Sequence, residues 1–563
     1  MLQGAEQKVT PSYVHGGMGP PLRGSTIGDA LDRVAAEHGE VEAVVSVFQD
    51  VRLTYRELQS EAETLAAGLI DLGLRPGDRL GIWSVNCVEW TVIQFAAAKA
   101  GVILVTINPA YRTRELEQVL EIAGCVGLVV GRPHKGSDFI EMLESIVPDL
   151  REVSVDLRSE RLPSLKYVVT LESSEGLVDY ASLREAGRRA GPGVLPAKET
   201  LQFDDPINIQ FTSGTTGTPK GVTLSHHNIL NNGIQTGAAA GIGIGDRVCI
   251  PVPLFHCFGM VVGNLACLGH AATAVYPGPS FDPLEVMEAV SGERCTHLYG
   301  VPTMMISILG HQRFAEFDFS SLRGGIMGGA PCAVETMKAV ISDLHMPEVT
   351  IIYGMTETSP VSFQTRLDDP FSARVETVGR VMPHIEAKIV DENDRVVSLG
   401  QPGQLCTRGY SVMSGYWGQE DLTQDVLGSD RWMHTGDLAT IDADGYCRII
   451  GRSKDIIIRG GENISPREIE EFLYTHPDVR NVEVVGIPDV RLGEEVCVWI
   501  IARDGSAPTE DDIREFCRGK IAHYKIPRYI RLVDEFPMTA SGKVQKFKIR
   551  DEMVALLSDG PKS

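Results

Sequence analysis

The sequence lacks the features of disulfide-rich, zinc-binding and nucleic-acid-binding proteins. Its 11 cysteines are an odd number without a C-x-x-C pair, which argues against a disulfide framework or a zinc site and indicates a reducing compartment. Basic residues are scarce: 52 Lys and Arg stand against 75 Asp and Glu, for a formal net charge of -23. Because so negative a surface repels phosphate backbones and anionic lipid, we expect no nucleic-acid partner, and an anionic ligand needs a local cluster of donors.

Long apolar runs are also missing. The opening "MLQGAEQKVTPSYVHGG" has neither an apolar run nor an arginine, so it resembles no targeting segment and we expect a cytoplasmic protein. Residues 248–281 contain no Asp, Glu, Lys or Arg, but proline, histidine and asparagine interrupt them. A membrane span needs about 20 consecutive apolar residues. This stretch therefore predicts a buried strand and helix, and no transmembrane segment is expected.

The first two-thirds of the chain alternates strand and helix patterns. A helix is predicted over residues 54–73, with a capping box from Thr54 to Glu57 and an end at Gly73. The runs "GVILVTI" and "INIQFT" read as short buried strands, the second leading into a glycine-rich loop. Such alternation predicts mainly parallel sheets covered by helices.

After about residue 380 the pattern changes to closely spaced strands and turns. Asp444 and Gly445 predict a hairpin turn, and Ser465 is expected to cap a helix whose capping box is completed by Glu468. The predicted fold is α/β. A large N-terminal domain, residues 1–453, has mainly parallel sheets covered by helices plus a small β-barrel-like part, and a small α+β C-terminal domain covers residues 454–563.

The loop "TSGTTGTPKG" has the composition of a phosphate-binding loop. Glycines free backbone N–H groups to face a ligand, hydroxyls add donors and a lysine adds charge. The loop nevertheless departs from the pattern G-x-x-x-x-G-K-[ST], because Pro219 stands at the position of the second glycine. The residues assigned to nucleotide binding here are Thr212, Ser213, Gly214, Thr215, Thr216, Gly217, Thr218, Pro219 and Lys220. Composition alone leaves a solvent-exposed turn as the alternative.

The loop resembles the signature of the adenylate-forming enzymes: acyl-CoA synthetases, aryl-CoA ligases, luciferases and peptide-synthetase adenylation domains. Further motifs of that family follow in order, namely "YGMTETSP", "TGD", "GRSKDIIIRGGENISPREIE" and "TASGKVQK". The resemblance runs over nearly the whole chain and is greatest to the medium-chain fatty acyl-CoA synthetases. It implies that a carboxylate and Mg-ATP form an acyl adenylate and pyrophosphate, and that coenzyme A then displaces AMP.

The resemblance also implies a role for individual residues. Thr215 to Lys220 would hold the β- and γ-phosphates, and Thr356 the α-phosphate. Glu357 and Thr215 would hold Mg²⁺, an ion that prefers oxygen ligands. Tyr353 would lie near adenine, Asp437 and Arg452 at the ribose, and Lys543 between the carboxylate and the α-phosphate. Further positions are Gly329, Ala330 and Pro331 beside the substrates, His256 at the acyl gate, Lys454 as the hinge of a mobile C-terminal domain, and Gly460 and Gly461 along the coenzyme A arm.

Taken singly, each residue has a plainer interpretation. Asp437 could cap a turn, His256 could be a core histidine, and Glu357, Lys454 and Lys543 could be ordinary surface residues. The order of the motifs along one chain favours the functional interpretation.

The acyl group is expected to end in a neutral apolar tail. An α-amino acid would need an acidic partner for its ammonium, and residues 248–281 contain no acid. Met304, Met305 and Met327 suit either a tolerant alkyl pocket or a plain core. Alternatives to a fatty acid–CoA ligase are an acyl-AMP ligase that loads a separate carrier protein, an aryl-acid CoA ligase, a luciferase-like oxygenase, and a binding protein that has lost catalysis.

Overall fold

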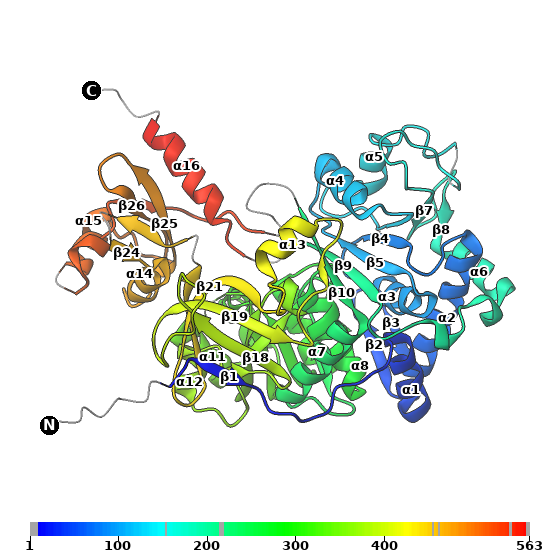
Figure 1. The fold of residues 1–563 in the computed structure, drawn as a ribbon, viewed down its shortest axis with the longest axis horizontal. Helices are drawn as coiled ribbons and strands as arrows, with labels where there is room; N and C mark the ends of the chain where they lie inside the picture. The colour runs from blue at the N-terminus through cyan, green and yellow to red at the C-terminus, as the bar shows by residue number, and fades with distance from the viewer. Residues whose placement is uncertain are drawn as a thin grey trace.

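The computed structural model describes residues 10–152, 155–212, 219–330, 332–452, 455–459, 462–518, 520–539 and 543–558. Four sheets organise this part of the chain (Figure 1). In that figure the orange-to-red C-terminal part lies at one end, beside the yellow-green sheet and away from the blue N-terminal helices. The predicted α/β class, with a large N-terminal domain of parallel-rich sheets and a smaller C-terminal domain, is confirmed.

The first sheet carries the phosphate loop at one side. Its order is β20 (Gly415–Tyr416), β10 (Lys220–Ser225), β9 (Pro206–Thr212), β5 (Ile103–Ile107), β4 (Arg79–Trp83), β6 (Gly127–Val130), β7 (Tyr167–Thr170) and β8 (Val178–Asp179). The strands from β9 to β8 are parallel, whereas β10 and β20 run antiparallel. The apolar strands "GVILVTI" and "INIQFT" are thus neighbours in this sheet, as β5 and β9.

The second sheet is also mainly parallel. Its order is β17 (Arg380–Val381), β16 (Val361–Gln364), β15 (Glu348–Gly354), β14 (Gly324–Gly328), β13 (His297–Gly300), β11 (Arg247–Cys249), β12 (Thr273–Tyr276), β2 (Glu42–Ser46) and β3 (Val51–Thr54). Parallel pairing runs from β15 to β2, and the edge pairs are antiparallel.

Helices join the two sheets through a shared core. The helices of this part are α1 (Ile27–His38), α2 (Tyr55–Leu72), α3 (Val88–Ala100), α4 (Thr113–Ala123), α5 (Phe139–Glu144), α6 (Tyr180–Ala190), α7 (His226–Ala239), α8 (Ala266–His270), α9 (Pro283–Glu293), α10 (Pro302–Leu309), α11 (Val334–Ser342), α12 (Phe371–Glu376) and α13 (Glu420–Val426). Phe95 of α3, Leu104 of β5 and Val248 of β11 belong to one hydrophobic cluster. At about 25 cal/mol per Å² of apolar surface, this shared burial is the main force holding the sheets together.

Two local predictions in this part are confirmed. Helix α2 begins after Thr54, whose side chain forms the capping box with Glu57, and it ends at Gly73, where φ is +124°. The uncharged stretch 248–281 is mostly buried, as the end of β11, a π-helix (Phe258–Leu265), α8 and β12. No helix in the part of the chain that the structure describes is both long and apolar enough to cross a membrane.

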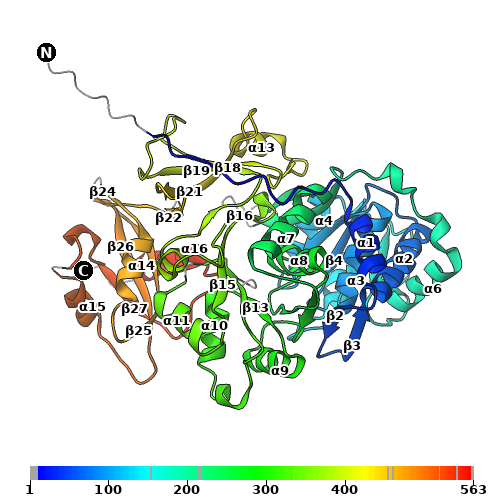
Figure 2. The same cartoon turned by 90° about the horizontal axis from the view of Figure 1, so that it is seen from below.

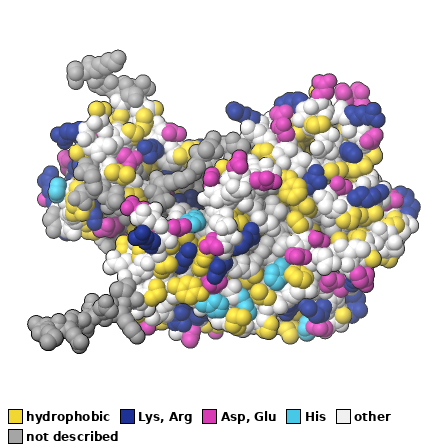
Figure 3. All heavy atoms as spheres, viewed as in Figure 1, with side chains coloured by type: hydrophobic (Ala, Val, Ile, Leu, Met, Phe, Trp, Pro, Cys, Tyr) yellow, Lys and Arg dark blue, Asp and Glu magenta, His cyan; other side chains and the backbone are white. Residues whose placement is uncertain are grey.

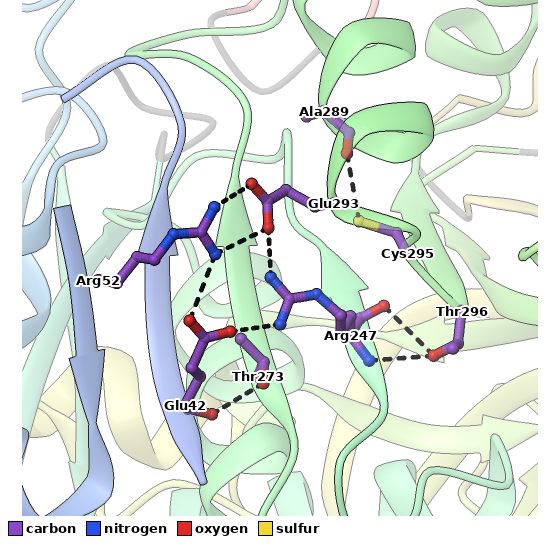
Figure 4. A network of polar contacts seen from close by, with 8 residues as sticks. All are labelled: Glu42, Arg52, Arg247, Thr273, Ala289, Glu293, Cys295 and Thr296. Carbon is purple, nitrogen blue, oxygen red and sulfur yellow. Dashed lines mark hydrogen bonds and ion pairs between the residues drawn. The ribbon is translucent and has the colours of Figure 1, made fainter. Parts of the chain in front are cut away.

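An ion-pair network ties the edge of the second sheet together (Figure 4). Arg52 of β3 lies 3.3 Å from Glu42 of β2 and 2.9 Å from Glu293 at the end of α9. Arg247 of β11 pairs with the same two carboxylates. Each acid therefore contacts two guanidinium groups, and the network links strands far apart in sequence.

A third, five-stranded sheet lies in the region predicted to contain a small β-barrel-like part. It is antiparallel throughout, in the order β1 (Tyr13–His15), β18 (Ile385–Val390), β19 (Gly403–Gly409), β21 (Met433–Ile441) and β22 (Cys447–Arg452). The hairpin predicted at Asp444 and Gly445 joins β21 to β22, and Gly445 has a φ of +83°. Acidic and basic side chains intermingle over the face that Figure 3 shows.

The fourth sheet belongs to the C-terminal part and has its own core. It contains β23 (Ile457–Arg459), β24 (Glu462–Ile464), β25 (Val479–Asp489), β26 (Gly493–Ala502) and β27 (Tyr529–Leu532), with α14 (Pro466–Leu473), α15 (Glu510–Cys517) and α16 (Lys546–Ser558). Figure 2 shows this unit at the end of the molecule. Residues 453 and 454 lie outside the described residues, so the boundary between them stays a prediction.

The capping box predicted for α14 is wrong. Ser465 does occupy the N-cap position with Pro466 in the first turn, but its side chain accepts no capping hydrogen bond. Its Oγ donates instead to the carbonyl of Ile450 in β22 at 2.7 Å. Glu468 pairs with Lys525. Contacts with distant parts of the chain have replaced the local ones.

Candidate active site

The sequence of the phosphate loop connects the antiparallel strands β9 and β10. Thr212 and Lys220 face each other across this pair of strands, and Pro219 is buried. Because β9 is parallel to β5, the loop leaves from the carboxyl end of a parallel strand, where α/β sheets commonly bind ligands. Ser213, Gly214, Thr215, Thr216, Gly217 and Thr218 lie outside the described residues.

Lys220 and Glu357 are brought together by a tyrosine. Thr356 and Glu357 start a 3₁₀ turn after β15, and both are buried. The Tyr416 hydroxyl donates to Glu357 Oε1 at 2.9 Å, and Lys220 Nζ lies 5.0 Å from the centre of the Tyr416 ring. The sequence motifs did not single out Tyr416, because its position depends on the pairing of β20 with β10.

A second cluster gathers Tyr353, Asp437 and Arg452. Asp437 and Arg452 are paired across β21 and β22, and Arg452 Nε lies 3.4 Å from Asp437 Oδ1. The Tyr353 hydroxyl donates to Asp437 Oδ2. Burial raises the pKa of the Asp437 carboxyl, while Tyr353 and Arg452 oppose that rise. The predicted adenine and ribose residues therefore form one group, joined by a hydrogen bond and an ion pair to Asp437.

Lys543, from the C-terminal part, lies beside Gly329 and acts electrostatically on Asp437. A Cβ atom built on Gly329, which has a φ of +82°, lies 3.5 Å from Lys543 Cε. Burial of the Lys543 ammonium group lowers its pKa; the Arg452 charge lowers it further, whereas Asp437 and Glu357 oppose the shift. Its backbone is held by Thr539, whose N–H donates to the Lys543 carbonyl at 2.7 Å.

His256 lies beside the same lysine. It is half-buried just before the π-helix, and its Nδ1 accepts a hydrogen bond from the Phe258 N–H at 3.1 Å. Burial, and secondarily Lys543, lower the pKa of His256 to about 3, so the ring is neutral near pH 7. Burial raises the pKa of the adjacent Cys257 thiol to about 12.

The structure describes some of the remaining predicted site residues and leaves others outside its described ranges. Gly329 and Ala330 follow β14 and are exposed. Met304, Met305 and Met327 are all buried, and Met305 and Met327 belong to the core between β13, β14 and α9–α11. Pro331, Lys454, Gly460 and Gly461 lie outside the described residues.

Family models match most of the chain. The AMP-binding enzyme family matches residues 31–417, and the AMP-binding enzyme C-terminal domain matches residues 468–543. The chain belongs to the AMP-binding enzyme family. The resemblance drawn from the five motifs is thereby confirmed.

Similar proteins include acyl-CoA ligases. The chain is 44% identical over 552 residues to medium-chain acyl-CoA ligase ACSF2, mitochondrial, of Bos taurus, covering 96% of this chain and 90% of that protein. It is 45% identical over 539 residues to the putative acyl-CoA synthetase YngI of Bacillus subtilis, covering 95% and 98%. The mammalian relative is mitochondrial by name, and a cytoplasmic location for this chain stays a prediction.

Solved structures share the fold. The anthranilate CoA ligase AuaEII in complex with anthranoyl-AMP matches with a TM-score of 0.84 and 27% identity, over 96% of this chain and 99% of that one. ATP-bound MatB from Rhodopseudomonas palustris matches with a TM-score of 0.81 and 27% identity, over 94% and 99%.

Proposed function

We propose that this protein is an ATP-dependent fatty acid–CoA ligase acting on medium-chain acids. The observation that carries the proposal is the approach of Lys543, from the C-terminal part, to Gly329 and to the charges of Asp437 and Glu357. The Lys543 ammonium group, placed among residues predicted to bind the nucleotide, can stabilise the negative charge where a carboxylate reacts with the α-phosphate. The names of the relatives at 44–45% identity support the acyl-CoA product.

In the first half-reaction a carboxylate oxygen of the acid attacks the α-phosphorus of ATP. A P–O bond forms, the bond to the β-phosphate oxygen breaks, and pyrophosphate leaves with the electron pair. Lys543 stabilises the charge that the carboxylate and α-phosphate share in the transition state, while Thr356 donates to the α-phosphate. Asp437 accepts from the ribose hydroxyls, with Arg452 beside it.

The residues present fit a magnesium ion. Glu357 offers a buried carboxylate that accepts from the Tyr416 hydroxyl, while Lys220 lies against the ring of the same tyrosine. Mg²⁺ prefers hard oxygen ligands of this type, together with substrate phosphates. Glu357 and Thr215 would hold it. When bound, the ion neutralises phosphate charge during adenylation.

In the second half-reaction the sulfur of coenzyme A attacks the acyl carbonyl carbon. A C–S bond forms, the C–O bond to AMP breaks, and the thiol proton is released. We assign the passage of the thiol to the loop containing Gly460 and Gly461, brought to the acyl adenylate by rotation of residues 454–563 about Lys454 against residues 1–453. The domain boundary and the hinge are parts of this proposal.

The acyl pocket is assigned to the stretch around His256. Residues 248–281 contain no charged side chain, and His256 is neutral, so an apolar tail meets no unpaired charge there. This favours a fatty acid over an α-amino acid. An aryl acid is the second candidate, since the structurally similar AuaEII is an anthranilate CoA ligase.

The test follows AMP and thioester formation with ATP, Mg²⁺, coenzyme A and straight-chain acids of graded length. We expect the highest activity with medium-chain acids. Lys543→Ala should lower the adenylation rate by about 10²–10³-fold, the scale of losing one transition-state donor, yet still convert supplied acyl adenylate to thioester. Lys548→Ala, at an exposed lysine of α16, is the matched control.

Each other outcome has a defined meaning. Adenylation without thioester formation would instead support an acyl-AMP ligase that loads a separate carrier protein. Preference for benzoate-like acids would support an aryl-acid CoA ligase. Absence of pyrophosphate release with every acid contradicts a ligase function, and equal loss of both half-reactions in Lys543→Ala contradicts its selective role.

A further inference from the structure

Tyr416 lies in the edge strand β20, between β10 and helix α13. It lies in β20 opposite Val222 of β10, and the Trp417 N–H donates to the Gly221 carbonyl at 2.7 Å. The Tyr416 N–H donates to Thr423 Oγ1 at 2.9 Å. The residue is 6% exposed. These hydrogen bonds fix the backbone at Tyr416, and burial restricts the movement of its ring.

The ring and the hydroxyl of Tyr416 contact two different motifs. The hydroxyl donates to Glu357 Oε1 at 2.9 Å, whereas the ring centre lies 5.0 Å from Lys220 Nζ. An ionised carboxylate only accepts hydrogen bonds, so the Tyr416 hydroxyl is the donor in this contact. A cation–π contact steers an ammonium group while its N–H groups can still donate to phosphate oxygens.

We propose that Tyr416 is a positioning residue that sets the distance between Lys220 and Glu357, and so orients the binding of Mg-ATP. This inference rests on the proposed function, in which Lys220 binds phosphate and Glu357 holds the metal ion. The hydroxyl orients Glu357 toward the ion, and the ring orients Lys220 toward the phosphates. The two halves of one side chain thus serve two parts of one ligand.

The division into ring and hydroxyl leads to separable effects. Tyr416→Phe removes the donor to Glu357 but keeps the ring beside Lys220. Tyr416→Leu removes both. We therefore expect the first variant to weaken nucleotide binding only when Mg²⁺ is present, and the second to weaken it with and without the ion.

The experiment is calorimetric titration of the whole protein with a non-cleavable ATP analogue, α,β-methylene-ATP, with and without Mg²⁺. We expect Tyr416→Phe to bind about tenfold more weakly with Mg²⁺, the scale of a hydrogen bond to a charged group, and to match the unmodified protein without it. Tyr410→Phe, at a partly buried tyrosine six residues earlier, should leave both affinities unchanged. In a Glu357→Gln background the Tyr416→Phe effect should disappear.

The outcomes separate this inference from the function on which it rests. If the unmodified protein fails to bind the analogue, the proposed function is contradicted. If it binds, and Tyr416→Phe binds as tightly with Mg²⁺ or loses affinity equally with and without the ion, only the positioning role is overturned. A melting curve for each variant identifies a folding defect, and Tyr416→Phe, which keeps the ring, provides the test if Tyr416→Leu fails to fold.

Discussion

Ribose recognition by Asp437 leads to a quantitative prediction. Its carboxylate already accepts from Tyr353 and lies 3.4 Å from Arg452, so it is held in place before the nucleotide binds. A hydrogen bond to a charged group contributes about 1.5–3 kcal/mol, which corresponds to roughly 10–150-fold in affinity. Asp437→Asn keeps the shape and removes the charge.

The assay is ATP–pyrophosphate exchange with ATP, 2′-deoxy-ATP and 3′-deoxy-ATP. We expect the unmodified protein to prefer ATP over at least one deoxy form by that factor in kcat/KM, and Asp437→Asn to lose most of this preference. Asp444→Asn, at an exposed position in the same hairpin, is the control. Because burial raises the pKa of Asp437, the variant should also lose the rise in KM for ATP that the unmodified protein shows as the pH falls through that pKa.

The refuting result is an equal loss for all three nucleotides. In that case the carboxylate does not contact the ribose hydroxyls, and its effect on activity is exerted through Tyr353 or Arg452. A Tyr353→Phe variant separates these two possibilities, because it removes only the hydroxyl that donates to Asp437.

Two further predictions concern stability. His226 Nδ1 accepts from the buried Ile27 N–H, and burial lowers the pKa of His226 to about 3. Folding therefore favours the neutral form of this histidine. The free energy of unfolding falls as the pH drops below about 6.5, and the loss at pH 5 is about 2 kcal/mol. His226→Asn, which keeps an acceptor, should reduce the difference in urea unfolding between pH 7.5 and pH 5 by that amount, and an unchanged difference contradicts the argument. In the ion-pair network of Figure 4, the Arg247 side chain is 20% exposed and the Arg52 side chain 49% exposed. Arg247→Met should therefore lower the free energy of unfolding by about 2–3 kcal/mol, and Arg52→Met by less than about 1 kcal/mol. Equal losses in urea unfolding would contradict this burial argument.

The sequence by itself determined the local structure and the family. The capping box of α2 and the turn at Asp444 and Gly445 were predictable because the residues that form them lie within four positions of each other. The same reasoning failed at Ser465, whose Oγ bonds to Ile450 in a preceding strand. Local patterns name the possible partners, but a competing partner from elsewhere in the chain cannot be read from them.

Only the tertiary structure decided how the motifs meet. The motif order identified Lys220, Glu357 and Lys543 as candidates, but Tyr416 joins the first two through the pairing of β20 with β10, which no spacing in the sequence predicts. The neutral state of His256 likewise follows from burial beside Lys543. Residue types specify which chemistry is available, whereas distances, burial and charge between remote residues depend on the path of the whole chain.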